Sequence, residues 1–185
     1  SRYSALIAKS MGFPEDYCEK LMLASPMHDI GKLGVPDAIL MKPGKLDETE
    51  WVEMKQHPIY GAKILKDSES ELLQMSSVVA LSHHEKFDGT GYPSGLKGKE
   101  IPIEGRIVAL ADVFDALTSR RVYKEKFSLD DTLKIIRESS GKHFDPEIVA
   151  AFEKVLPQIS EIMLKYADRP EEQQTGLPKD QHRPA

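Results

Sequence analysis

The sequence predicts an all-α fold in which several helices pack into one domain. Apolar residues recur every three or four positions through most of the chain, which is the spacing of one face of an α-helix. No segment shows the alternation of apolar and polar residues that is typical of a half-buried strand, and no internal repeat is present. With 185 residues and 40% hydrophobic composition, the chain is long enough to bury a substantial core.

The first two predicted helices lie on either side of Gly12. Apolar positions between residues 3 and 11 fit the first, and this pattern starts so close to Ser1 that we expect the sequence to be cut from a longer one. Pro14 suits the first turn of the second helix, where no backbone donor is needed. Pro26 is expected to end or kink that helix, because it removes a donor from the helix interior. A loop-rich stretch with several glycines and prolines follows.

Three more helices are predicted in the next part of the chain. Asp47 followed three residues later by Glu50 is a capping box, in which each side chain reaches the backbone N–H of the other residue. Pro58 interrupts the helix that this box opens, and residues 59–66 form the next one. Residues 72–81 are an apolar run of small and branched side chains, which is typical of a buried helix.

The second half of the chain contains a long loop and four predicted helices. Five of the twelve glycines fall within residues 85–105, and a loop of about twenty residues in a compact domain suggests a function. Ser128 is expected to cap one of the helices that follow. Residues 168–185 hold three prolines and almost no apolar side chains, which predicts a polar, flexible tail. The four helices are expected at residues 107–117, 129–136, 146–152 and 157–164.

The composition excludes several classes of function. Lys and Arg number 25 against 30 Asp and Glu, so the formal net charge of −5 argues against binding to long nucleic acid. Cys18 is the one cysteine, which excludes an internal disulfide and a metal site built from cysteines. No apolar run approaches the roughly 18 residues of a membrane span. Because a signal peptide is also missing, we expect this segment to be cytoplasmic.

Four of the six histidines have neighbours that suggest a metal site. The candidate ligands are two adjacent pairs and two single residues, and about 26 to 29 residues separate one candidate from the next. Since that distance is one helix plus a connection, successive helices can bring them to one point in a bundle core. His143 and His182 have no such neighbours and are expected to be structural or solvated. The candidates are His28, Asp29, His57, His83, His84 and Asp112.

The types of these residues indicate the metal and the chemistry. Imidazole and carboxylate without thiolate suit Fe, Mn, Zn or Ni. Neighbouring residues on a helix point about 100° apart, so His83 and His84 could serve two ions, or one ion and a substrate phosphate. The two oxygens of Asp29 could bridge two ions, and such a pair activates water and stabilises a displacement at phosphorus. A single histidine is more often a surface or capping residue, so the hypothesis depends on the whole set.

Three blocks of sequence around these residues carry a further signal. Residues 28–32 read HDIGK, residues 83–93 read HHEKFDGTGYP, and residues 112–119 read DVFDALTS. The first resembles the signature of HD-type phosphohydrolases, and the second resembles the longer signature of the HD-GYP subfamily. The resemblance extends over about residues 2–155. It implies an all-α multi-helix bundle of the HD phosphohydrolase type, with residues 1–167 as one HD-GYP domain whose first helix is truncated.

The resemblance also implies roles for individual residues. The six candidate ligands bind two or three divalent ions, Fe or Mn being favoured over Zn or Ni, and Asp29 bridges two of them. Lys32 stabilises charge or protonates the leaving group, and it stays on the side of Asp29 if a helical turn persists past Gly31. The alternative for Lys32 is a solvated surface lysine. The residues that correspond to substrate contacts are Asp115, Arg121 and Lys124.

Two parts of the resemblance leave alternatives open. The segment Gly91, Tyr92 and Pro93 is expected either to shape the loop beside His83 and His84 or to meet partner domains, such as those of the diguanylate cyclase type. Family members carry a further ligand histidine on the helix before the His-Asp pair, whereas residues 1–27 contain none. We expect that ligand upstream of Ser1, so the choice between two and three metals stays open.

The function implied by the resemblance is hydrolysis of cyclic di-GMP, a bacterial second messenger. Hydroxide activated by the metals attacks phosphorus and opens the ring to linear pGpG, and whether pGpG is then cleaved to GMP stays open. Two alternatives remain, namely a phosphodiesterase of another cyclic dinucleotide and a catalytically silent sensor or docking module. HD-GYP domains usually follow a receiver or sensory domain and often act as dimers, so we expect an upstream regulatory domain and a homodimer.

Overall fold

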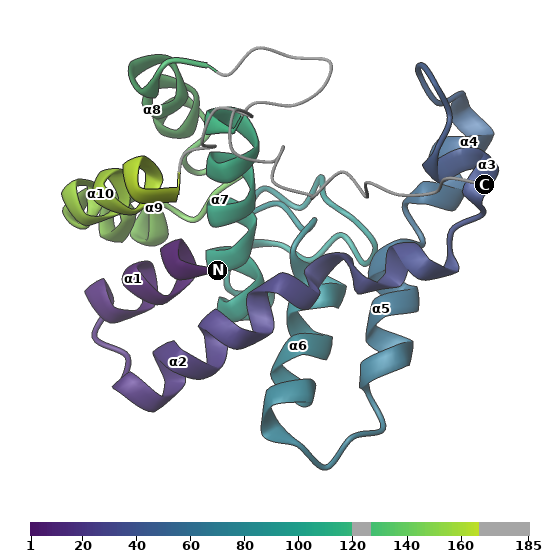
Figure 1. Cartoon of the computed structure of the whole chain (residues 1–185), viewed down its shortest axis with the longest axis horizontal. Coiled ribbons are helices and arrows are strands. Elements are labelled where there is room, and N and C mark those ends of the chain that lie inside the picture. Colours follow the sequence, from purple (N-terminus) through teal and green to yellow (C-terminus); the bar gives the residue numbers. More distant parts are fainter. Residues whose placement is uncertain (120–126, 167–185) are drawn as a thin grey trace, which may run out of the picture.

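The computed structural model describes residues 1–119 and 127–166, and within these ranges the chain is helical apart from its connections (Figure 1). The described residues form ten α-helices and two 3-10 helices, and their one β-bridge, between Ser140 and Phe144, is isolated. The all-α fold class is therefore confirmed. The predicted tail lies outside the described residues, as do Arg121 and Lys124.

The first helices follow the prediction up to Pro26. Helix α1 (Arg2–Ser10) is followed by α2 (Glu15–Ala24), which ends just before that proline as expected. The next stretch was wrongly predicted as loop. It forms the 3-10 helix η1 (Ser25–Gly34), which begins with Pro26 in its first turn, and then the short α3 (Asp37–Leu40). A proline is compatible with a helix start because the first N–H groups of a helix have no intrahelical acceptor.

The middle helices confirm the capping box. In front of α4 (Glu48–Met54), Asp47 Oδ1 accepts from Glu50 N at 2.9 Å and Glu50 Oε2 accepts from Asp47 N at 2.8 Å. Helix α5 (His57–Leu65) carries Pro58 in its first turn, so the proline starts a helix as well as interrupting the previous one. Helix α6 (Glu71–Ser82) then leads to the glycine-rich loop.

The remaining helices match the prediction within a few residues. Within the glycine-rich loop lies the short 3-10 helix η2 (Gly98–Glu100), which was predicted as loop. Ser128 caps α8 by accepting from Asp131 N at 3.0 Å. None of the described helices has the length and apolar character that crossing a membrane would require. The helices after the loop are α7 (Ile103–Thr118), α8 (Leu129–Glu138), α9 (Pro146–Lys154) and α10 (Leu156–Tyr166).

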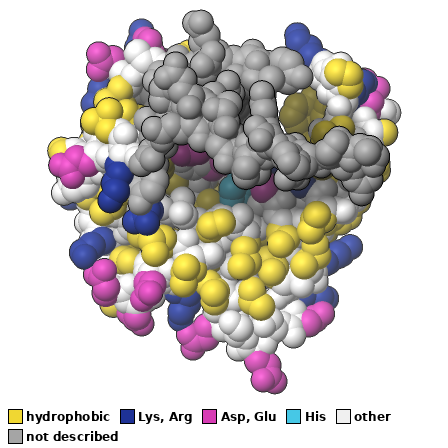
Figure 2. All heavy atoms as spheres, in the orientation of Figure 1, with side chains coloured by type: hydrophobic (Ala, Val, Ile, Leu, Met, Phe, Trp, Pro, Cys, Tyr) yellow, Lys and Arg dark blue, Asp and Glu magenta, His cyan; other side chains and the backbone are white. Residues whose placement is uncertain are grey.

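Helix α7 contributes Ile107, Leu110 and Phe114 to the hydrophobic core and lies between the helices near the two ends of the chain and the half of the molecule that carries the candidate ligands. In Figure 1, α1, α9 and α10 lie on one side of α7, and η1, α5 and α6 lie on the other. The core side is closed by ring contacts of Phe114 with Tyr3 and with Phe152, each with centroids 5.2 Å apart. Exposed apolar side chains, by contrast, gather in the lower half of the face in Figure 2, over α2, α5 and α6. The exposed large apolar residues of these three helices are Leu23, Ile64, Val78 and Leu81.

The glycine-rich loop is tied to the core half by a buried ion pair. Arg106 Nη1 lies 2.5 Å from Asp145 Oδ2, and the Asp145 side chain is fully buried. Arg106 Nε also donates to Ile101 O at 2.9 Å, so one guanidinium joins the end of the loop to the start of α9. Two loop amides also donate to this half, Phe87 N to the carbonyl oxygen of His143 and Asp88 N to that of Lys142. These contacts hold a loop that has little regular structure of its own.

Candidate metal centre

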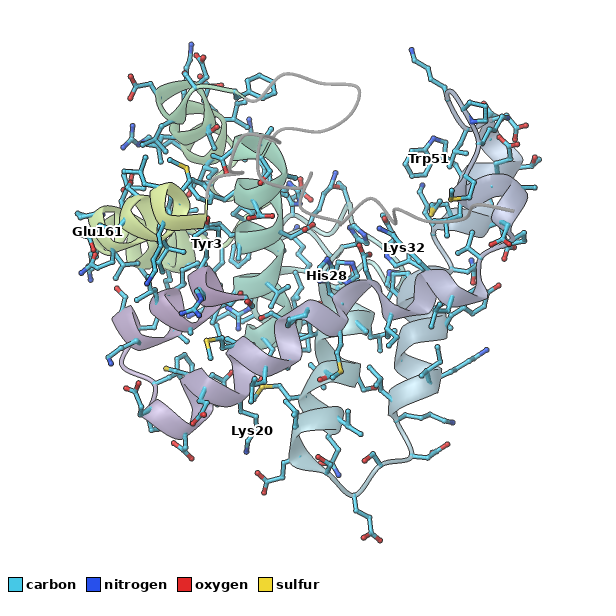
Figure 3. The ribbon with its side chains drawn as sticks, viewed as in Figure 1. Tyr3, Lys20, His28, Lys32, Trp51 and Glu161 are labelled. Atoms are coloured by element: carbon cyan, nitrogen blue, oxygen red, sulfur yellow. The ribbon has the colours of Figure 1, made fainter. Side chains whose placement is uncertain are left out.

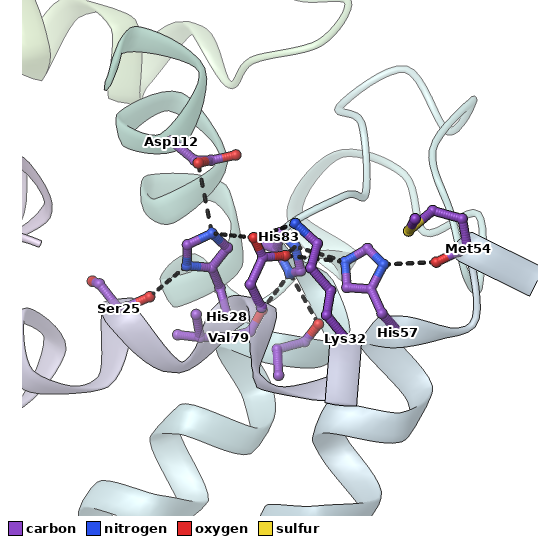
Figure 4. A network of polar contacts seen from close by, with 10 residues as sticks. Ser25, His28, Lys32, Met54, His57, Val79, His83 and Asp112 are labelled. Atoms are coloured by element: carbon purple, nitrogen blue, oxygen red, sulfur yellow. Dashed lines mark hydrogen bonds and ion pairs between the residues drawn. The ribbon is translucent and has the colours of Figure 1, made fainter. Parts of the chain in front are cut away.

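The six candidate ligands come from η1, α5, α7 and the turn at the end of α6, and Figure 4 labels four of them: His28, His57, His83 and Asp112. One pair lies within the 3-10 helix η1, where Asp29 directly follows His28. His57 is the first residue of α5, and His83 caps the end of α6. The tertiary fold therefore brings together residues up to 84 positions apart in sequence, with Asp112 projecting from the middle of α7.

Asp29 lies at the centre of the cluster, and its oxygen Oδ1 faces the histidines of α5 and α6. Oδ1 is 3.4 Å from His57 Nε2 and 3.9 Å from His83 Nε2. Possible ligand atoms of these three residues and of His84 all lie within 4.8 Å of one another. Among the described residues, this group has the ligand number and types that could hold a divalent metal ion.

The second oxygen of Asp29 faces the other side of the centre. Oδ2 is 3.4 Å from His28 Nε2, which in turn lies 3.6 Å from Asp112 Oδ1. Lys32 Nζ donates to the same Oδ2 at 2.5 Å. Because η1 continues to Gly34, Lys32 lies on the side of Asp29, as the three-residue spacing predicted. The candidate ligands thus form two groups that share Asp29: one lies around Oδ1, with His57 and His83, and the other lies around Oδ2, with His28 and Asp112.

The hydrogen bonds of three histidines test whether the cluster suits a metal. Nδ1 of His28, His57 and His83 lies 2.8, 2.8 and 2.9 Å from the carbonyl oxygen of the residue three positions earlier. A carbonyl can only accept, so Nδ1 carries the proton and Nε2 presents a lone pair. His57 Nε2 and His83 Nε2 are 3.4 Å apart, so two lone pairs face each other beside a carboxylate. A bound cation would relieve this repulsion, and the donor set fits one.

The protonation states agree with metal binding. Burial, followed by the nearby His57, lowers the pKa of His84 to about 3, and burial also lowers the pKa of His57 and of His83. Burial alone would raise the pKa of Asp29, but the Lys32 hydrogen bond and His28 hold that pKa below its usual value. At neutral pH His57, His83 and His84 are therefore neutral and Asp29 is ionised, which are the forms that bind metals.

Gly31 makes the close approach of η1 and α5 possible, a role that the sequence did not reveal. A Cβ added at Gly31 would lie 1.8 Å from the carbonyl oxygen of His57 and 2.3 Å from the amide nitrogen of Gly61. Both clashes involve backbone atoms, so no side-chain rotation could relieve them. The glycine therefore sets the distance between the helix of Asp29 and the helix of His57.

The Gly91, Tyr92 and Pro93 segment lies directly against the cluster. The ring of Tyr92 stacks on His84, with centroids 4.7 Å apart and an interplanar angle of 24°. Burial, then the carboxylates of Asp29 and Asp112, raises the pKa of Tyr92 to about 12, so its hydroxyl stays neutral at physiological pH. A Cβ on Gly91 would lie 2.5 Å from Glu85 Cα, so this turn also requires glycine. These contacts are consistent with the predicted shaping of the loop beside His84.

Glu85 is a buried carboxylate that sequence reasoning treated only as a neighbour of the histidine pair. It is 2% exposed and accepts from Ser94 N at 2.8 Å and from Leu96 N at 3.1 Å. Both donors belong to the chain just after Pro93. Glu85 thus holds the loop in position. The sequence feature that could have indicated this role was its place directly after the histidine pair.

Removing the Glu85 carboxylate is expected to loosen this loop. Glu85→Ala leaves the partly buried N–H groups of Ser94 and Leu96 without their acceptor, so we expect the free energy of unfolding to fall by about 1 kcal/mol. Glu85→Gln keeps one acceptor oxygen and should lose less. Urea unfolding of the three proteins measures both differences, and equal stability of Glu85→Ala and wild type would contradict this role for the carboxylate.

The remaining predicted residues are placed as follows. Asp115 is exposed on α7, one turn beyond Asp112. His143 lies outside the cluster and stacks on Phe144 with centroids 4.3 Å apart, in keeping with the structural role expected for it. Burial lowers the pKa of His143 to about 4. Arg121, Lys124 and His182 are not among the described residues.

Comparisons with known proteins identify the family. Residues 1–148 match the model of the HD domain. A cyclic di-GMP phosphodiesterase of Thermotoga maritima is 47% identical over 165 residues, which cover 89% of this chain and 45% of that protein. A 3′3′-cGAMP-specific phosphodiesterase of Vibrio cholerae is 45% identical over 147 residues, which cover 80% of this chain and 28% of that protein.

A solved structure supports the fold independently. The crystal structure of a cyclic GMP-AMP specific phosphodiesterase of V. cholerae matches with a TM-score of 0.65 at 20% identity, over 90% of this chain and 44% of that one. This chain spans less than half the length of each of these proteins. The chain belongs to the HD domain family, and within it to the HD-GYP proteins that its sequence resembles.

Proposed function

We propose that this chain is the hydrolytic domain of a phosphodiesterase that opens cyclic di-GMP to linear pGpG, with GMP as the alternative final product. The observation that carries this proposal is the set of inward-facing Nε2 lone pairs around Asp29. The name of the Thermotoga relative supports the substrate. Next to the cluster, a concave surface of about 480 Å³ is lined by Asp29, Lys32 and Leu33, and it could admit part of a nucleotide.

The proposed ligands would bind at least two divalent ions, Fe or Mn being favoured. His57, His83 and His84 with Asp29 Oδ1 would hold one ion. His28 and Asp112 with Asp29 Oδ2 would hold the second. Ions in such a pair supply water of lowered pKa and neutralise charge on the phosphate. The choice between two and three ions stays a prediction.

The chain's own side chains have defined tasks in this proposal. Lys32 donates to Asp29 Oδ2, so its ammonium is held beside the proposed metals. From there it stabilises charge on the leaving oxygen or gives it a proton. Asp115 remains a proposed substrate contact on the exposed end of α7. Arg121 is the second, because its planar guanidinium suits phosphate or guanine, and Lys124 is the third.

A mixed guanine–adenine ring is the second candidate substrate. The V. cholerae relative named for 3′3′-cGAMP is nearly as similar to this chain as the Thermotoga relative is. To separate the two, purified protein loaded with Mn²⁺ or Fe²⁺ is incubated with each cyclic dinucleotide, and the products are resolved by chromatography. We expect faster conversion of cyclic di-GMP. Bound metal without hydrolysis of either ring would contradict the proposal and favour a silent sensor or docking module.

The proposal extends to the surroundings of the domain. We propose an upstream receiver or sensory domain, a homodimer and a cytoplasmic location, with a diguanylate-cyclase-type domain as a partner of the Tyr92 loop. The relatives are more than twice as long as the matched segment, which supports additional domains in proteins of this kind.

A further inference from the structure

A second concave surface lies between α4 and the glycine-rich loop, on the far side of Tyr92 from the cluster. Its volume is about 590 Å³, and its lining combines aromatic, aliphatic and two cationic side chains with one carboxylate, Glu48, and one hydroxyl, Thr90. We call it the α4 groove. The lining residues that matter here are Trp51, Val52, Lys55, Lys86 and Tyr92.

The α4 groove is linked to the candidate metal centre by two contacts. The Tyr92 ring that lines it stacks on His84, one of the candidate ligands, at 4.7 Å. On the other wall, the carbonyl of Met54 at the end of α4 lies 2.8 Å from Nδ1 of His57. Lys55 comes next in the chain, and its Nζ lies 5.5 Å from the centroid of the Tyr92 ring. A ligand that reaches from the cluster past Tyr92 therefore enters this groove.

Trp51 is placed to bind a flat ligand and is not needed by the core. Its residue is 48% exposed, and none of the residues of α4 is buried. In Figure 3 the Trp51 side chain projects from α4 toward the middle of the molecule, where Lys32 and His28 are seen. An indole left half exposed beside two lysines offers a stacking surface together with positive charge.

We propose that the α4 groove binds one purine base of the cyclic dinucleotide, stacked on Trp51, with the ammonium groups of Lys55 and Lys86 facing its phosphate. The identity of the nucleotide rests on the proposed function. A purine has the flat, polarisable face that suits an indole, and base–aromatic stacking tolerates either guanine or adenine. The lysines complement the phosphate as point charges. The groove would hold one nucleotide while the scissile phosphate lies at the cluster.

Intrinsic fluorescence tests this proposal without turnover. Trp51 is the one tryptophan among the 185 residues, so indole emission, excited selectively over the six tyrosines, reports on the α4 groove. We expect GMP to quench this emission saturably and ribose 5-phosphate, which has no base, to leave it unchanged. Equal responses to the two compounds, or no response to GMP, would overturn the proposal whether or not the chain hydrolyses anything.

Kinetics test whether the groove serves the substrate. Trp51→Ala is expected to raise KM for the cyclic dinucleotide about 5- to 100-fold with little change in kcat, because stacking on Trp51 is lost equally in ground state and transition state. Trp51→Phe keeps an aromatic face and should stay near wild type. The kcat for bis(p-nitrophenyl) phosphate, which has no purine, should be the same in all three proteins.

A control variant and the possible negative results distinguish failure of the groove proposal from failure of the proposed function. Ile64 on α5 is 55% exposed and does not line the groove, so Ile64→Ala should leave both KM values unchanged. An unchanged KM for cyclic dinucleotide in an active Trp51→Ala protein would refute the groove alone. If the wild-type protein cleaves bis(p-nitrophenyl) phosphate but no cyclic dinucleotide, the proposed function is wrong. The fluorescence titration then still shows whether the α4 groove binds a purine nucleotide.

Discussion

Replacing Asp29 with alanine is expected to remove the bound metal and to lower turnover by at least about a thousand-fold. Both oxygens of Asp29 take part in the cluster, one facing His57 and His83, the other facing His28 and Lys32. Without this carboxylate, imidazole lone pairs face one another with no anion between them. Asp29→Asn keeps the shape of the side chain and removes its negative charge, so it separates the contribution of the charge from that of the shape. We expect this variant to lose most of the metal as well.

Metal content by mass spectrometry and initial rates with cyclic di-GMP measure this prediction. His143→Ala is the control, since His143 stacks on Phe144 outside the cluster and should change neither quantity. Circular dichroism checks that each variant remains helical. Wild-type metal stoichiometry in Asp29→Ala would contradict the central position of this residue.

Replacing Gly31 with alanine is expected to have the next largest effect, although a methyl group is all that it adds. Its Cβ would lie 1.8 Å from the His57 carbonyl oxygen, so α5 must move away from η1. Overpacking of this kind costs about 1–3 kcal/mol of stability, and backbone clashes lie at the upper end. A displacement of about 1 Å between Asp29 and His57 can cost on the order of 100-fold in rate. We therefore expect weak metal binding and a loss of turnover of at least that size.

Gly12→Ala provides the comparison for Gly31→Ala. Gly12 has φ of +89° and nothing within 4 Å of an added Cβ, so alanine there costs about 1 kcal/mol through backbone strain alone. Both variants should unfold at lower denaturant concentration. Loss of metal in Gly31→Ala with full metal content in Gly12→Ala supports the close approach of η1 and α5, and equal metal content in the two would contradict it.

Local signals predicted most helix boundaries correctly. The Asp47–Glu50 capping box and the Ser128 cap involve residues three positions apart, so the interactions that start these helices are present in the sequence itself. The 3-10 helix η1 was missed because Gly31, Gly34 and Pro26 are also typical of loops. In the folded chain η1 packs against α5 and α6, and a local sequence pattern cannot show contacts with such distant segments.

The candidate cluster was predicted as a set, and the structure adds how its members meet. The choice of His28, Asp29, His57, His83, His84 and Asp112 came from residue types and motif resemblance. The division of partners between the two Asp29 oxygens, the burial that keeps the imidazoles neutral and the supporting carboxylate of Glu85 depend on distances between separate elements. Trp51 lies in a helix that the capping box predicted, but only the structure places it with Tyr92 in the lining of the α4 groove.

The sequence by itself determined the helical class, the caps and the residues able to bind metal, because periodicity, capping and ligand chemistry depend on residue type and short spacing. Only the tertiary structure decided which lone pairs converge, why position 31 must be glycine and where the α4 groove lies. These properties depend on packing between η1, α4, α5, α6 and the glycine-rich loop. Such packing is governed by shape and burial across long sequence separations, and no single segment of the chain contains that information.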